Sequence, residues 1–290
     1  MEIIMGFFAE LTVWLNGILT SYISDTASAV AAALEPAVIT LAAVYMMFWG
    51  YLQVSGQIQE PLLDGLKRIA RLVIVLGLGL HLWLYNSLIV DTFFNAPVEL
   101  AAAISGSPDA VTVVDQIISS GGDTAGALIQ KGGILDGNFS YYLAGFFVYL
   151  AVGLAAVYTI FLLSLARIAL SVLLALGPLF LCALLFRGSS RLFDSWISQL
   201  INYGLIAVLA TLVTTLLMHL LTTAAAQAAA LGTGIQIVDA VRVCFASALM
   251  FLLLRQIMPI AAGLAGGSSL TSFGAFSRSI QWLGERVHSI

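Results

Sequence analysis

The chain has 290 residues, of which 61% are hydrophobic and only 9% are charged. An ordinary soluble domain has about 25% charged residues, so this composition, with a mean hydropathy of +1.04, indicates a membrane protein with several spans. The net charge of -4 and the pI near 5.2 provide no basic surface for nucleic acid and argue against sequence-specific DNA recognition.

The chain begins with an amphipathic pattern, because the apolar side chains of residues 3–22 fall on one helical stripe. We therefore predict an amphipathic helix in residues 1–35 that does not cross the membrane. Helices that bind anionic lipid carry Lys and Arg on their polar face, and this one carries none, so docking on protein is the expected role. Without a positive region ahead of it, the segment is not a cleavable signal peptide, and we expect it to remain.

Five later stretches are long and apolar enough to cross a bilayer core of about 30 Å, which takes about 20 helical residues. They are residues 36–54, 72–90, 141–163, 200–221 and 240–260. A sixth stretch, residues 168–186, is interrupted by Gly177 and Pro178. We predict an all-α polytopic membrane protein with five full transmembrane helices and a re-entrant or kinked sixth segment. Six full spans is the alternative.

The break at Pro178 has a defined chemical consequence. A proline inside a helix removes one backbone hydrogen bond and presses its ring against the carbonyl four residues earlier, here that of Leu174. At membrane depth the freed groups need protein or trapped water as partners. The break therefore predicts a bundle or an oligomer around it.

Lys67, Arg68 and Arg71 lie between the first two predicted spans. The positive-inside rule places this basic loop in the cytoplasm and the N-terminal helix in the periplasm. Residues 36–90 are thus predicted to form two transmembrane helices joined by a cytoplasmic loop.

Residues 91–140 then face the periplasm as a loop domain, which is longer than a connection requires. Its Gly, Ser and Pro clusters at residues 105–108, 119–122 and 132–133 predict short helices between breaks. The candidate residues for contact with a substrate or a stalk are Asp109, Asp115, Asp123 and Lys131.

Residues 141–262 complete the predicted bundle, and residues 263–290 form a predicted cytoplasmic amphipathic tail. If segment 168–186 returns to the side it entered from, Arg187 and Arg191 are cytoplasmic. If it crosses, they lie outside.

Few ionisable groups fall inside the spans. His81 and His219 have no acid three or four residues away, so a structural role is favoured over a proton relay. Arg242 and Arg255 lie near opposite ends of the last span, where reaching the headgroups is favoured over lining an inner surface. No catalytic, cofactor or metal motif is present, so none of these sites is predicted.

Trp196 shares a helical face with Leu192, Phe193, Ile197 and Leu200. The favoured interpretation is an aromatic anchor at the inner membrane interface. The alternative is a knob that binds a partner.

The order of these parts resembles the polytopic inner-membrane subunits of type IV secretion systems. The resemblance covers roughly residues 30–262, and its local marker is the Gly-Pro break followed by Arg191, Phe193 and Trp196. It implies a conjugation or effector-export machine in a Gram-negative inner membrane, in which this subunit has no catalytic site and partner ATPases supply energy. It also implies structural and assembly roles for Gly177, Pro178, Arg187, Arg191, Phe193 and Trp196.

The expected partners follow from the same resemblance: further inner-membrane subunits, secretion ATPases, a periplasmic stalk or minor pilin, membrane lipids, and copies of the chain itself, with fivefold symmetry suggested. DNA or protein enters only as the transported substrate. The main alternative is a secondary transporter, which usually has two broken helices in related halves, whereas one break is visible here. A membrane enzyme lacks any supporting constellation.

Overall fold

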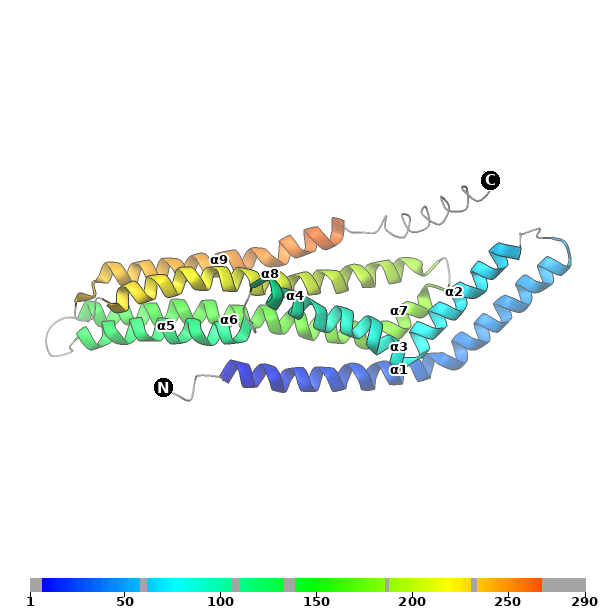
Figure 1. Ribbon diagram of the computed structural model, residues 1–290, viewed down its shortest axis with the longest axis horizontal. Coiled ribbons are helices and arrows are strands. Elements are labelled where there is room, and N and C mark those ends of the chain that lie inside the picture. The colour runs from blue at the N-terminus through cyan, green and yellow to red at the C-terminus, as the bar shows by residue number, and fades with distance from the viewer. Residues whose placement is uncertain are drawn as a thin grey trace. The chain divides into compact units, whose positions relative to one another are not determined.

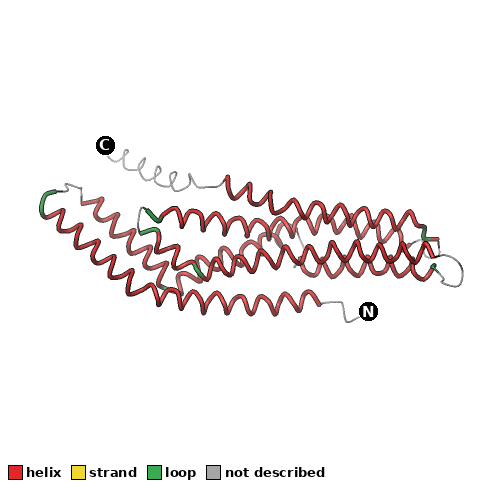
Figure 2. Tube along the Cα trace, turned by 180° about the vertical axis from the view of Figure 1, so that it is seen from behind, coloured by secondary structure: helices red, strands yellow, loops and turns green. Residues whose placement is uncertain are grey.

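The computed structural model describes residues 7–57, 62–105, 110–132, 139–185, 188–230 and 234–267, and each regular element within these ranges is helical (Figures 1 and 2). Five stretches of the described chain are long and apolar enough to cross a membrane: Glu10–Val54, Leu82–Ile104, Phe139–Ala175, Ser190–Ala224 and Ile237–Gly266. The predicted all-α polytopic membrane fold with five spans is confirmed, although several boundaries differ from the prediction.

The first helix, α1 (Phe7–Val54), is continuous over 48 residues and contains Pro36. No break in the helix therefore marks the predicted boundary between an amphipathic helix in residues 1–35 and a span starting at residue 36. A proline inside a helix costs about 3 kcal/mol. The alanine-rich stretch before Pro36 and the apolar stretch after it favour the helix strongly enough to continue it.

The second predicted span, residues 72–90, is also misplaced. Helix α2 (Leu62–Leu80) stops at His81, whose backbone is extended with φ -89° and ψ 98°. It is followed by α3 (Leu82–Tyr85), the π-helix η1 (Asn86–Asn95) and α4 (Ala96–Ser105). The stretch long enough to cross is Leu82–Ile104, which includes residues expected in the outer loop.

The remainder of the predicted loop domain is mostly helix α5 (Ala110–Lys131). The breaks expected at residues 105–108 and 132–133 lie mostly outside the described residues, and the helix runs without interruption through Gly121 and Gly122. A Cβ added to Gly121 would lie 2.6 Å from a Val152 methyl carbon. The glycine therefore marks a close approach between helices instead of a turn.

The described chain divides into two compact units. The first comprises Met1–Ile18, Ala96–Ile168 and Tyr203–Gly263. In it α5 packs with α6 (Phe139–Ala175), α8 (Ser190–Ala230) and α9 (Ile237–Gly267), which run side by side in Figures 1 and 2. Its core includes Ile117, Leu128, Val152, Leu162 and Leu254. Because α5 contributes to this core, residues 91–140 are not a separate loop domain.

The second unit comprises Leu19–Asn95, Ala169–Asn202 and Leu264–Ile290. It contains the later part of α1, α2, α3, η1, the end of α6, the start of α8 and the short helix α7 (Gly177–Ala183), which contacts α2. Helix α9 continues to Gly267, into the predicted tail. Residues 268–290 lie outside the described residues.

Candidate functional site

The predicted Gly-Pro break is confirmed and lies in the second unit. Helix α6 ends at Ala175, and α7 starts at Gly177 with Pro178 in its first turn. Residues 168–175 extend α6, and α7 has seven residues, which is about 10 Å at 1.5 Å per residue. Such a helix is too short to cross a core of about 30 Å, so the described residues do not support the six-span alternative.

Two side chains from other helices supply donors to the end of α6. The Tyr85 hydroxyl donates a hydrogen bond to the Leu174 carbonyl, the same carbonyl that Pro178 deprives of its helical partner. The Trp196 indole N–H donates to the Leu173 carbonyl, with an Nε1–O distance of 2.8 Å. Both carbonyls belong to the last turn of α6, where a helix provides no partner of its own. The break is therefore capped by protein.

The capping site is closely packed. Tyr85 is fully buried, and a Cβ added to Gly177 would overlap the Tyr85 hydroxyl oxygen and lie 2.6 Å from the ring carbon Cζ. Only a hydrogen fits at this position. Gly177 thus makes room for the side chain that satisfies Leu174, which is a structural reason for a glycine directly before Pro178.

Trp196 also forms the centre of an aromatic cluster. It stacks on Phe180 of α7 with a centroid distance of 5.7 Å and an interplanar angle of 16°, and it lies 5.6 Å from the Phe193 ring. Only 2% of Trp196 is exposed. The interpretations of Trp196 as a surface anchor or a partner-binding knob are therefore wrong, because its ring and its N–H are both used inside the protein.

The remaining predicted positions are distributed more widely. Arg191 is exposed near the start of α8. Asp115 is half-buried and Asp123 is exposed. The Lys131 ammonium donates to the Ile235 carbonyl ahead of α9 and lies 4.9 Å from the centre of the Tyr141 ring. Lys131 therefore connects α5, α6 and the segment ahead of α9 within the first unit. Arg187 and Asp109 lie outside the described residues.

Comparison with known proteins places these features in a family. The model of the TrbL/VirB6 plasmid conjugal transfer proteins matches residues 42–257, a range that includes Tyr85, the Gly-Pro break and Trp196.

The chain belongs to the TrbL/VirB6 family. It is similar to the type IV secretion system protein VirB6 of Bartonella henselae, with 23% identity over 204 residues, covering 70% of this chain and 62% of that protein. The relative of the same name in Bartonella quintana has the same identity and coverage. The one in Brucella abortus is 23% identical over 195 residues, covering 63% of this chain and 56% of the relative. The chain thus spans less than two thirds of the length of these TrbL/VirB6 relatives.

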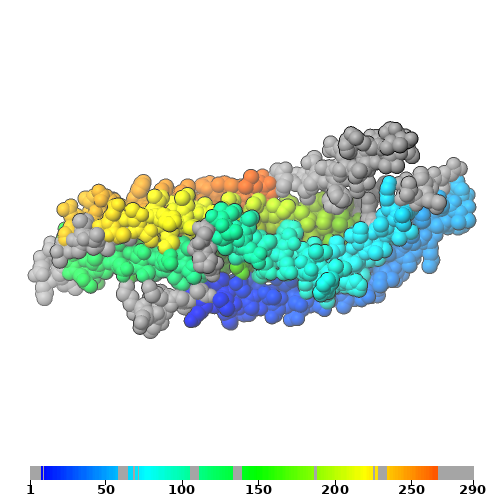
Figure 3. Space-filling model, in the orientation of Figure 1, coloured from blue at the N-terminus to red at the C-terminus, as the bar shows by residue number. Residues whose placement is uncertain are grey.

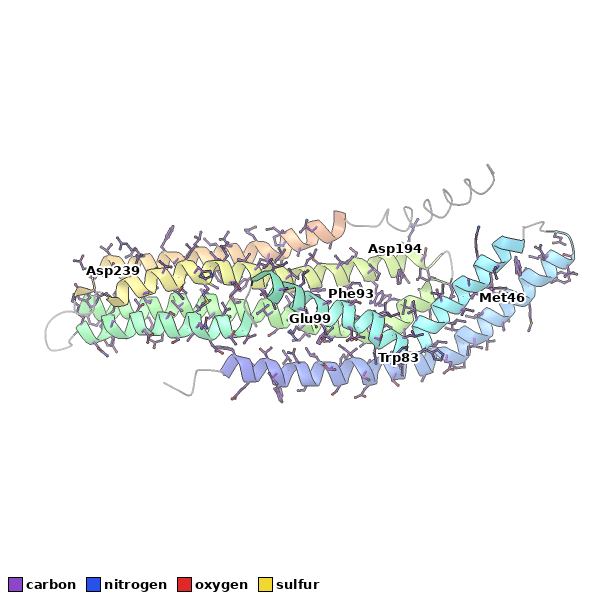
Figure 4. All side chains as sticks on the ribbon, viewed as in Figure 1. Met46, Trp83, Phe93, Glu99, Asp194 and Asp239 are labelled. Atoms are coloured by element: carbon purple, nitrogen blue, oxygen red, sulfur yellow. The ribbon has the colours of Figure 1, made fainter. Side chains whose placement is uncertain are left out.

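Elsewhere in the described part of this TrbL/VirB6 protein, ionisable groups were the other sequence-based candidates. His81 is exposed at the junction of α2 and α3, not inside a span as predicted, and His219 is exposed on α8. Arg242 pairs with Asp239, labelled at the start of α9 in Figure 4, at 3.3 Å. Among the described residues no group of three or more His, Cys, Asp or Glu side chains is arranged to hold a metal ion.

Tyr85 is the functional candidate that the sequence analysis missed. Its bonding partner Leu174 is 89 residues away in the chain, so no local pattern joins them. The available signal was indirect: the carbonyl freed by Pro178 requires a donor, and a tyrosine in an apolar run is one of the few residues able to provide it.

Proposed function

We propose that this TrbL/VirB6 protein is an inner-membrane subunit of a type IV secretion machine, and that it serves as a channel component or assembly platform for the export of DNA or protein. The observation that carries the proposal is the family match over residues 42–257. Five stretches able to cross a membrane support a multi-pass subunit.

The elbow, defined as Gly177, Pro178 and the capping residues Tyr85 and Trp196, is proposed to fix the direction of α7 for assembly. The two hydrogen bonds hold the end of α6 against α3 and α8, the stack of Phe180 on Trp196 holds α7 against α8, and α7 also contacts α2. On this rigid base α7 exposes Leu179, with Leu176 exposed just before it. These apolar side chains, with the exposed Arg191, are the surface offered to other secretion subunits and ATPases.

The capped elbow argues against the secondary transporter. Transporters with broken helices use the unwound backbone carbonyls to coordinate ions near the midplane. Here Tyr85 and Trp196 already donate to the Leu174 and Leu173 carbonyls, so these groups are committed to the fold. We propose that partner ATPases provide the energy and that the chain holds no cofactor or metal.

The proposed orientation follows from five crossings and the positive-inside rule. Residues 55–71, 187–199 and the C-terminus are cytoplasmic, and the N-terminus and the region around α5 are periplasmic. Of the four residues predicted to meet a stalk, a minor pilin or the substrate, the exposed Asp123 is the best placed. Assembly as a homo-oligomer, with fivefold symmetry suggested by the resemblance, remains part of the proposal.

The test is deletion of the gene in its native host, followed by complementation. Conjugation or effector export should be lost and should return when the full chain is supplied. Single cysteines at residues 123 and 189, in a background without Cys182 and Cys244, should be labelled from the periplasm and the cytoplasm respectively. Unchanged transfer in the deletion strain would contradict the function, and the reverse labelling pattern would contradict the orientation.

A further inference from the structure

Helix α5 packs along the first half of α6 in the first unit, and the two helices run side by side in Figures 1 and 2. Three close approaches fix their alignment, because a Cβ added to the glycine of each pair would lie no more than 2.8 Å from the partner residue: Gly121 with Val152, Gly145 with Ile129, and Gly132 with Tyr142. The residue number rises along one helix as it falls along the other, so the helices are antiparallel and a single alignment satisfies all three contacts. It places residues 116, 123 and 130 of α5 level with about residues 158, 151 and 144 of α6.

Helix α5 exposes one narrow polar line, the α5 edge, defined as Gln116, Asp123 and Gln130. Of the side chains described in residues 111–131, these three are exposed, and the others are buried or half-buried. Steps of seven residues are close to two helical turns, so the three lie along one side of the helix over about 21 Å. The green α5 forms part of the surface of the first unit in Figure 3. What α5 offers to its surroundings is therefore polar.

Helix α6 exposes the opposite kind of surface at the same level. Each exposed side chain between residues 142 and 157 is aromatic or aliphatic. The α6 line, defined as Leu143, Leu150 and Val157, also advances in steps of seven, and its side chains are 44%, 53% and 60% exposed. This part of α6 belongs to the stretch Phe139–Ala175, which is able to cross a membrane. Its surface is that of a helix in hydrocarbon.

Helix α9 is also apolar at this level. Lys131 holds the segment ahead of α9 near the start of α6, and the Phe251 ring meets the Tyr158 ring with a centroid distance of 5.0 Å. These contacts place residues 237–251 of α9 beside the same part of α6. The exposed side chains there are apolar except that of Arg242, which has an acidic partner three residues earlier. Two helices of the bundle thus present apolar surfaces at the level of the α5 edge.

The α5 edge and the α6 line require different surroundings. Asp123 stands level with about the middle of the predicted span 141–163, where a carboxylate that faces lipid costs a few kcal/mol. The amides of Gln116 and Gln130 also need partners when they leave water. A second copy offers few, because the exposed side chains of α6 and α9 described at this level are apolar apart from Arg242. Water satisfies all three side chains without a specific partner.

We propose that the α5 edge faces a water-filled space that lies within the assembled machine and opens to the periplasm, while the α6 line faces lipid. The inference deepens the proposed channel function and rests on it, because polar groups at membrane depth face water only where protein keeps lipid away. It explains why a helix from the predicted outer loop packs along the depth of a span and exposes a polar line. It also agrees with the proposed labelling of residue 123 from the periplasm.

The test compares single cysteines on the two lines, in a full chain that carries Cys182→Ala and Cys244→Ala and is expressed with its secretion machine. The α5 edge is probed by Gln116→Cys, Asp123→Cys and Gln130→Cys. The matched controls, which lie at the same levels on α6 and are likewise exposed, are Leu143→Cys, Leu150→Cys and Val157→Cys.

Intact cells are treated with a small charged thiol reagent that passes the outer membrane but not the inner one. The α5 cysteines should react at least about tenfold faster than the α6 cysteines, because apolar surroundings disfavour both the charged reagent and the reactive thiolate. An uncharged, membrane-permeant maleimide should then label all six variants, which shows that each thiol is available. Immunoblotting confirms equal abundance in the membrane.

Equal reaction of the two lines with the charged reagent would show that this end of the bundle stands wholly in water. Slow reaction of both would show that lipid or protein covers the α5 edge. Either result overturns the inference. If the deletion strain nevertheless loses export, the secretion function stands and the inference alone has failed, so the two failures are distinguishable.

Discussion

Tyr85→Phe tests the elbow by removing one atom. The ring keeps its packing, but the Leu174 carbonyl loses the donor that replaces the N–H missing from Pro178. Tyr85 is fully buried, so water does not readily take over this bond. A buried acceptor left without a partner costs about 1–3 kcal/mol. We therefore expect the free energy of unfolding to fall by about this amount.

The assay is denaturant-induced unfolding of the purified full chain in mixed detergent and lipid. Tyr149→Phe is the matched control, because Tyr149 is 47% exposed on α6. Loss of its hydroxyl group should change the free energy of unfolding by less than about 0.5 kcal/mol. Trp196→Phe in combination with Tyr85→Phe should give a coupling of at least about 0.5 kcal/mol, since both donors hold one helix end. The reasoning is refuted if Tyr85→Phe and Tyr149→Phe unfold alike.

Three further outcomes are expected. Gly177→Ala should lower the free energy of unfolding by about 1–3 kcal/mol, because the added methyl group overpacks against Tyr85. Adding Tyr85→Phe should restore part of this loss, because it removes the overlapped oxygen. Unfolding of the single and double variants measures both effects, and a double variant with no such recovery would contradict the geometry. Trp196→Ala should lower the free energy of unfolding by about 3–5 kcal/mol and reduce the amount of protein in the membrane, which immunoblotting detects. Normal abundance would show that the aromatic cluster is dispensable. Lys131→Met should destabilise the first unit by about 0.5–1.5 kcal/mol, because the hydrogen bond to the Ile235 carbonyl is lost. Unfolding measurements compare it with Arg255→Met, a change at an exposed position, and equal effects of the two changes would contradict a stabilising role of Lys131.

The features that sequence predicted well are local in the chain. Span number follows from the length of apolar runs, and the break follows from Pro178, which lacks a backbone donor wherever it sits. The end of α5 at Lys131 likewise follows from Gly132 directly after it. Each signal lies within a few residues of the structure it determines.

Boundaries inside apolar runs were harder to predict. The apolar pattern continues on both sides of His81 and of Pro36, yet the helix breaks at the first and passes through the second. Gly121 and Gly122 read as a turn in sequence, but in the structure Gly121 accommodates Val152. Tertiary packing decides these cases, and it is absent from a hydropathy profile.

The residues that cap the elbow could not be predicted from local sequence, because they lie far from the break in the chain. Leu174 was recognised as the carbonyl in need of a donor, but Tyr85 is 89 residues away and Trp196 bonds across 23 residues. A tryptophan among apolar residues is typical of an interface anchor, and only the stacking of Trp196 on Phe180 shows that it belongs to the interior. The chemical requirement was predictable, whereas the identity of the residue that meets it was not.

The most direct test of the account is a conjugation or effector-export assay with variants compared at equal membrane abundance. If the chain is a secretion subunit whose elbow supports assembly and whose energy comes from partners, the His81→Ala, His219→Ala double variant should transfer at nearly the wild-type rate. Trp196→Phe, which keeps an aromatic ring but removes the donor to Leu173, should transfer clearly less. Loss of transfer in the histidine variant with normal transfer in Trp196→Phe would contradict the account and favour a proton-coupled transporter.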